Sequence, residues 1–178
     1  MADYTGSNTP PEHRDKWRTP SAIFNALDKE FNFAIDVAAS DENHLCEKYH
    51  TEENCGLSKA WDVPTLSYAW CNPPYSNIKP WVDQANRQAK RGIGCVMLIP
   101  QDQSVGWFKE SLRSCAEVRI ITGGRIAFIN ASTGLPVKGN NKGSQFIIWR
   151  PFNDYPVITR YIDRDKLIAM GTQLQQAA

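Results

Sequence analysis

The stretch "YAWCNPPYSNIKPWVDQANRQAKRGIGCVMLIP", residues 68–100, shows the fold of this chain most clearly. It begins with a short apolar run at 68–71, typical of a strand, and ends with a longer apolar run at 94–100, typical of a buried central strand. Between them we expect a helix over 77–91, because apolar side chains recur there at helical spacing: Ile78, Trp81, Val82 and Ala85. Strands that alternate with helices predict an α/β sheet.

The rest of the chain continues this alternation. Further helices are expected over 21–30 with Ser21 as the N-cap, after Ser40, over 104–115 and over 162–174. Further strands are expected to end near Asp36 and to cover 117–122, 124–129 and 144–149. The last two strands have no helix between them, which predicts an antiparallel hairpin. The predicted fold class is therefore α/β, with a doubly wound, mostly parallel sheet and a C-terminal antiparallel hairpin.

Length and composition indicate one domain. The chain has 178 residues, of which 42% are hydrophobic and 22% charged, so a single domain over 1–178 with its own core is expected. Residues 1–16 are expected to form a flexible arm. Neither a signal peptide nor an apolar run of about 18 residues is visible, which predicts an intracellular protein. The net charge of +1 argues neither for nor against a nucleic-acid partner.

The five cysteines do not indicate a disulfide framework. Their number is odd and no C-x-x-C pair occurs, so reduced and mostly buried thiols are expected. One cluster of possible zinc ligands consists of His44, Cys46, His50 and Cys55. Its spacing matches no common zinc module, so we predict no bound metal.

The polar residues after the first strand of the opening stretch suit a binding site. Pro73 and Pro74 carry no backbone N–H, and Pro73 holds Asn72 in an extended conformation at the strand end. Asp36 also follows a predicted strand. Because ligands of such sheets bind outside the carboxyl ends of the strands, Asp36 and Asn72 are expected to lie at the same edge.

Three segments carry a family resemblance. The tetrapeptide Asn72–Tyr75 resembles the catalytic motif of S-adenosylmethionine-dependent amino-methyltransferases. Together with "KWRTPSAIFNALDKEFNFAIDVAAS" (16–40) and "GGRIAF" (123–128), it resembles the phage-type Dam family of DNA adenine methyltransferases over about residues 15–150. The resemblance implies a Rossmann-like class I methyltransferase that methylates the adenine 6-amino group of double-stranded DNA, with GATC as target and a bacterial cytoplasm as location.

The proposed chemistry explains the residue types of the tetrapeptide. The lone pair of the adenine 6-amino group is delocalised into the ring, so two acceptors aimed at its hydrogens would free it for attack. The Asn72 side-chain oxygen and the Pro73 carbonyl are the expected acceptors, with Pro74 completing the motif. Tyr75 would stack on the base, which must be flipped out of the duplex to be reached. An ordinary strand-ending turn is the alternative.

The resemblance also implies a site for the methyl donor, S-adenosyl-L-methionine. Its expected residues are Trp17, Thr19, Pro20 and Asp36, with Asp36 accepting hydrogen bonds from the donor's ammonium. Asp36 as an N-cap and Trp17 as a core anchor are the alternatives. The glycine-rich loop common in methyltransferases is absent, and the ribose-binding acid stays open between Glu47, Glu53 and Asp62.

Charge distribution indicates a DNA-contacting segment. No acidic residue occurs from Val118 to Asn153, whereas five basic ones do: Arg119, Arg125, Lys138, Lys142 and Arg150. We expect the loop 130–143 to contact DNA through Arg125, Lys138 and Lys142, with a solvated hairpin tip as the alternative. Phe128 is expected to pack against the flipped base or, equally, to be a core side chain in a hairpin strand.

Two other functions share these features. The same tetrapeptide serves methylation of protein glutamine and of RNA, and the basic, acid-free segment favours nucleic acid over protein. A non-catalytic DNA-binding or decoy protein with this fold is the second alternative, against which the intact tetrapeptide argues. The recognition sequence, the oligomeric state and the biological purpose stay open.

Overall fold

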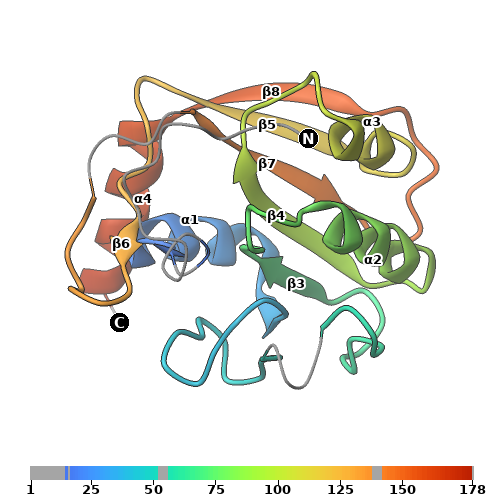
Figure 1. The fold of residues 1–178 in the computed structure, drawn as a ribbon, viewed down its shortest axis with the longest axis horizontal. Helices are drawn as coiled ribbons and strands as arrows, with labels where there is room; N and C mark the ends of the chain where they lie inside the picture. The colour runs from blue at the N-terminus through green and yellow to red at the C-terminus, as the bar shows by residue number, and fades with distance from the viewer. Residues whose placement is uncertain (1–14, 16, 52–55, 138–141, 178) are drawn as a thin grey trace.

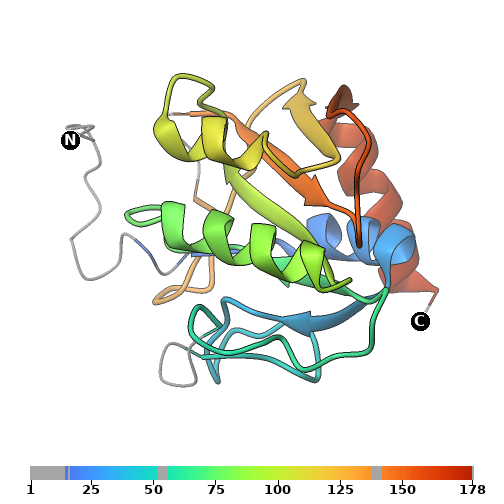
Figure 2. The same cartoon turned by 90° about the vertical axis from the view of Figure 1, so that its right-hand side faces the viewer.

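A central sheet with helices on both faces makes up the molecule (Figures 1 and 2). The structure is a computed structural model and describes residues 15, 17–51, 56–137 and 142–177. The sheet has six strands in the order β2-β3-β4-β7-β5-β8. These strands are β2 (Phe33–Asp36), β3 (Tyr68–Cys71), β4 (Gly94–Pro100), β7 (Ser144–Trp149), β5 (Glu117–Thr122) and β8 (Ile158–Asp163). The helices are α1 (Ser21–Phe31), α2 (Lys79–Lys90), α3 (Gly106–Ser111) and α4 (Arg164–Gln176).

The predicted α/β class with a mostly parallel sheet is confirmed. β2, β3 and β4 run parallel to one another, as do β5 and β8. β7 is antiparallel to both of its neighbours, β4 and β5. All six residues of β7 are buried, which is why this strand occupies the middle of the sheet.

The predicted C-terminal hairpin is wrong. Residues 124–128 form no strand, and only β6 (Ile129–Asn130) remains of the expected partner of β7. β6 pairs instead with β1 (Trp17–Arg18) in a separate two-stranded sheet. Gly123 and Gly124, with φ of 76° and 144°, end the extended conformation of β5 in a backbone region that side chains disfavour. The chain leaves the sheet there and returns only at β7.

Two further expectations fail. No helix follows Ser40; instead the main chain of residues 48–50 lies beside β2, where Asp36 N donates to Lys48 O at 3.0 Å and His50 N donates to Asp36 O at 2.8 Å. β8 is a strand that the sequence does not predict, and it takes up the first two residues of the helix expected over 162–174, so that α4 begins at Arg164 with Asp163 as its N-cap. Most of β8 is exposed, so it lacks the buried apolar pattern of the other strands.

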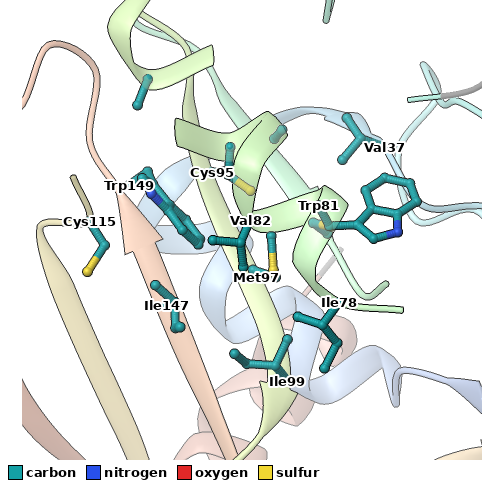
Figure 3. Close-up of a cluster of buried hydrophobic side chains, with 14 of the residues drawn as sticks. Val37, Ile78, Trp81, Val82, Cys95, Met97, Ile99, Cys115, Ile147 and Trp149 are labelled. Carbon is teal, nitrogen blue, oxygen red and sulfur yellow. The ribbon is translucent and has the colours of Figure 1, made fainter. Parts of the chain in front are cut away.

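Each face of the sheet has its own hydrophobic core. On one face α1 and α4 pack together against the sheet, with Leu27, Trp70 and Phe146 at the centre. On the other face α2 and α3 cover β4 and β7. In Figure 3 Val82 of α2 and the N-cap residue Ile78 lie toward side chains of the sheet, among them Met97 and Ile99, whereas the Trp81 ring of α2 lies toward Val37. Both faces of β4 are therefore covered, as its unbroken apolar sequence predicts.

The shorter elements differ from expectation only at their ends. Ser21 is the first residue of α1 rather than its cap, because the N-cap position is Pro20. α3 spans six residues, about half of the predicted range. Within the described ranges, none of the helices is long and apolar enough to cross a membrane.

Candidate active site

The candidate site lies at the carboxyl ends of β2 and β3. Asp36 is the last residue of β2 and pairs in register with Trp70, two residues before Asn72. The two polar side chains thus follow neighbouring parallel strands at one edge of the sheet, where such folds bind ligands.

Asn72 is held by a contact from the other end of the chain. Its amide Nδ2 donates to the backbone carbonyl of Trp17 at 3.1 Å, and the residue is half-buried. A carbonyl can accept but not donate, so this bond assigns the nitrogen end of the amide to Trp17. The accepting Oδ1 therefore points away from Trp17.

Tyr75 and Phe128 form an aromatic pair behind the tetrapeptide. Their ring centroids are 6.1 Å apart and their planes are nearly perpendicular, at 88°. Phe128 is 3% exposed and belongs to the core on the α1 side, so it supports the Tyr75 ring from inside. Of the two expectations for Phe128, the geometry favours the core role, although in a loop before β6 rather than in a hairpin strand.

A narrow pocket lies between the loop that carries the tetrapeptide Asn72–Tyr75 and the segment before α1. Asp15, Trp17, Asn72, Pro73 and Tyr75 line it. Its free space is enough for about one water molecule. A purine base does not fit until the lining moves.

Asp36 is almost fully buried. Its carboxylate accepts hydrogen bonds from Leu45 N at 3.1 Å and from Ala38 N at 3.3 Å. Burial raises the pKa of Asp36 from 3.8 to about 6, against these two bonds and the nearby His44, which lower it. The expected alternative, an N-cap, does not apply because no helix follows. Asp36 is instead a buried anion held by backbone N–H groups of the loop 38–45.

The other expected donor-binding residues surround the start of α1. The Thr19 side chain is buried, and within the described part of the chain its hydroxyl has no hydrogen-bond partner. The Pro20 carbonyl accepts from Ile23 N at 2.9 Å and begins the helix. Trp17 is half-buried in β1 and packs against the core on the α1 side, as the core-anchor alternative expects.

The three candidates for the ribose-binding acid differ in where they lie. Glu47 is exposed, and Glu53 lies outside the described residues. Asp62 lines a second pocket together with Thr65, Arg91 and Ile93, near the amino end of β4. The described residues hold no group of three or more His, Cys, Asp or Glu side chains placed to bind a metal ion, and Cys55 lies outside them.

The basic residues of the acid-free segment serve different purposes. Arg125 is exposed in the loop after β5, at the same edge of the sheet as Asn72. Lys142 makes an ion pair with Asp102, and this contact, with hydrogen bonds from Ser104, lowers the pKa of Asp102 from 3.8 to about 2. Lys138 lies outside the described residues.

Two of the five basic residues are paired with acidic side chains of the fold, Arg119 as a buried residue and Arg150 as an exposed one. Arg119 donates to Glu117 at 2.8 Å and, through two nitrogens, to Glu30 at 2.7 and 3.0 Å. Arg150 lies 3.6 Å from Glu117 and over the Phe31 ring. The absence of acidic residues between 118 and 153 therefore overstates the basic surface, because the acidic partners come from elsewhere in the chain.

Asp15 is a residue of the site that the sequence does not predict, because it lies within the expected flexible arm 1–16. Its carboxylate accepts from Ser76 N at 3.1 Å and from Ser76 Oγ at 2.5 Å. Asp15 precedes Trp17 by two residues, and this nearness to the W-x-T-P segment was the signal available in the sequence.

The sheet, its Asn-Pro-Pro-Tyr loop and the buried acid beside it fit the class of enzymes that methylate amino groups. The family model described as "DNA N-6-adenine-methyltransferase (Dam)" matches residues 6–174. The chain belongs to this family of adenine-specific DNA methyltransferases.

Two curated relatives agree with the family. The "DNA N-6-adenine-methyltransferase" of Escherichia phage T1 is 36% identical over 175 residues, which cover 89% of this chain and 73% of that protein. The protein of the same name from Haemophilus phage HP1 (strain HP1c1) is 35% identical over 154 residues, which cover 85% of this chain and 87% of that protein.

Proposed function

We propose that this protein transfers a methyl group from S-adenosyl-L-methionine to the 6-amino group of adenine in double-stranded DNA, after flipping the base out of the duplex. The observation that carries the proposal is the fixed amide of Asn72, whose nitrogen is bound to the Trp17 carbonyl and whose oxygen is left for an amine. Family membership supplies the substrate class.

In the proposed step the chain's own groups prepare the amine. The Asn72 Oδ1 and the Pro73 carbonyl accept hydrogen bonds from the two amino hydrogens and favour a tetrahedral nitrogen. When bound, the donor supplies a methyl group on a sulfonium. The nitrogen lone pair forms the new N–C bond as the S–C bond breaks, and the sulfur keeps that electron pair. The nitrogen then carries a positive charge and loses one proton to water, so no strong side-chain base is needed.

The residues around the start of α1 fit a methyl donor. Thr19 has a buried hydroxyl that lacks a hydrogen-bond partner among the described residues, and a bound ligand would supply one. Asp36 offers a buried carboxylate to an ammonium group, a contact that burial strengthens. Trp17, Thr19, Pro20 and Asp36 are accordingly the residues proposed to hold the donor.

The flipped base would occupy the pocket lined by Tyr75 and Asn72 once it has widened. Tyr75 offers a π-face to the base, and the edge-on Phe128 ring fixes the orientation of Tyr75. An inserted base is held by stacking because it has left its neighbours in the duplex. Phe128 then acts through Tyr75 and does not touch the base.

DNA contact is proposed for the loop 130–143 and its flanks. Arg125 is exposed at the site edge, and Lys142 stands at the end of the loop. GATC is the proposed target, on the family resemblance alone. The fixed orientation of Asn72 favours a catalytic protein over a non-catalytic decoy, in which that orientation would have no use.

The test is methyl transfer with defined substrates. The protein is incubated with labelled donor and a duplex containing GATC, and the product is hydrolysed to identify N6-methyladenine. A duplex of equal composition in which the site is scrambled to GTAC is the matched control, with RNA and a glutamine peptide as further substrates. Label in N6-methyladenine of the first duplex supports the proposal. Label found only in RNA or peptide overturns the proposal, and so does the absence of label in a protein that binds the donor. Equal labelling of both duplexes refutes only the proposed GATC target.

A further inference from the structure

The segment before α1 is fastened to the catalytic loop at two points. We call Asp15, Trp17 and Arg18 the strap. Asp15 holds Ser76 through both the backbone N–H, at 3.1 Å, and the hydroxyl, at 2.5 Å. Two residues further on, the Trp17 carbonyl accepts from the Asn72 amide at 3.1 Å. The two contacts bracket the tetrapeptide, because Ser76 follows it directly.

The second contact decides the chemistry that Asn72 can offer. The two ends of a primary amide have nearly the same shape, but one accepts and the other donates hydrogen bonds. An amide that turned its nitrogen toward the substrate amine would present hydrogen to hydrogen and oppose the reaction. The Trp17 carbonyl prevents this, since only the nitrogen end can bind it.

The position of the Trp17 carbonyl depends in turn on how the strap is held. On the side away from the tetrapeptide, β1 makes only a two-residue ladder with β6, in which Trp17 is opposite Asn130. So short a ladder is a weak constraint by itself. Asp15 ties the strap directly to the loop that carries Asn72.

We infer that Asp15 is a positioning residue for methyl transfer: by gripping Ser76 it keeps the Trp17 carbonyl against the Asn72 amide, and so keeps the accepting oxygen turned toward the reacting amine. This inference rests on the proposed function of Asn72. Asp15 lines the pocket proposed for the base, but in this role it acts through Ser76 and Trp17.

The experiment compares Asp15→Ala, Asp15→Asn and Ser76→Ala in single-turnover methyl transfer at saturating donor and duplex. Asp15→Ala is expected to slow transfer by about 10-fold, since misplacing a reacting group is costly. Asp15→Asn is expected to stay within about threefold of wild type, because its Oδ1 still accepts from the Ser76 N–H. Ser76→Ala added to Asp15→Ala should slow transfer no further, because Asp15→Ala has already removed both contacts with Ser76. Asp83→Ala, which breaks the surface ion pair with Lys79, is the control and should leave the rate unchanged.

A second background separates positioning from general loosening. Asn72→Asp has two accepting oxygens and no end to orient, so adding Asp15→Ala should slow it by less than about threefold. The inference is overturned if Asp15→Ala reacts at the wild-type rate, or if Asp15→Asn slows transfer as much as Asp15→Ala does. It is also overturned if Asp15→Ala slows the Asn72→Asp protein as much as it slows the wild-type protein. If Asn72→Asp is too slow to measure, the first comparison decides. Asn72→Ala is measured in parallel. If Asn72→Ala transfers methyl groups at the wild-type rate, the proposed role of the tetrapeptide is refuted. If Asn72→Ala is slow but Asp15→Ala reacts at the wild-type rate, only the inference about Asp15 is refuted.

Discussion

The ionisation of Asp36 should control both donor affinity and the pH dependence of stability. Burial raises its pKa from 3.8 to about 6, a difference of about two units that is worth about 3 kcal/mol. Because the folded-state pKa is the higher one, the folded protein binds this proton more tightly than the unfolded chain does. The resulting stabilisation is fully present below about pH 4 and is lost as the pH rises through about 6.

Donor binding should follow the opposite course. An ammonium ion binds the ionised carboxylate, so donor affinity should fall by up to about tenfold per pH unit below pH 6, where a proton must leave first. Asp36→Asn should bind the donor roughly 10- to 100-fold more weakly, the range for a hydrogen bond to a charged group. The donor affinity of this variant should no longer vary between pH 5 and 7. Its stability should vary less over the same interval, as the ionisation step is gone.

Two titrations check this prediction. Calorimetry gives the donor dissociation constant, and thermal unfolding without donor gives the stability, each measured from pH 4.5 to 8. Asp28→Asn is the control, since Asp28 also accepts a backbone N–H, from Phe33 at 2.7 Å, but away from the proposed site. Equal donor affinity of Asp36→Asn and wild type at pH 7.5 would refute the role of Asp36, and an unchanged slope in the variant would assign the pH dependence to another group.

Three further outcomes are expected. Tyr75→Ala should weaken base binding by about 1–3 kcal/mol, whereas Tyr75→Phe should keep most of it, as measured by fluorescence of a base analogue at the target position. Lys142→Ala should reduce the salt dependence of DNA affinity by about one unit of log–log slope, because Lys142 is proposed to leave its ion pair with Asp102 and to bind a DNA phosphate. An unchanged slope would mean that Lys142 pairs with Asp102 but does not contact DNA. Glu117→Ala should lower the free energy of unfolding by about 1.5–3 kcal/mol, because Arg119 loses its charged partner Glu117 but keeps Glu30, and a loss under about 0.5 kcal/mol would contradict this prediction.

Much of the fold could be predicted because its strands are buried. The apolar runs at 94–100 and 144–149 are strands with no exposed residue. Their partners could not be predicted, since pairing of β7 with both β4 and β5 depends on contacts distant in sequence. β8 escaped detection because most of its side chains face solvent.

The candidate site divides in the same way. Asp36 and Asn72 could be placed together because both end parallel strands, a relation that local patterns reveal. The partners that set their chemistry could not be placed: Trp17 and Asn72 are 55 residues apart, and Asp15 and Ser76 are 61 apart. Charge counting failed at Arg119 for the same reason, because its partner Glu30 is 89 residues away.

The most direct test of the account is single-turnover transfer of a labelled methyl group to duplex DNA by Asn72→Ala, with donor affinity and melting temperature measured on the same samples. An interaction that is strongest in the transition state affects the rate more than binding. Asn72→Ala should therefore keep its fold and its donor affinity but react at least roughly 100-fold more slowly, a loss comparable to removing one transition-state hydrogen bond. Transfer at the wild-type rate would contradict the account and place the reacting amine elsewhere.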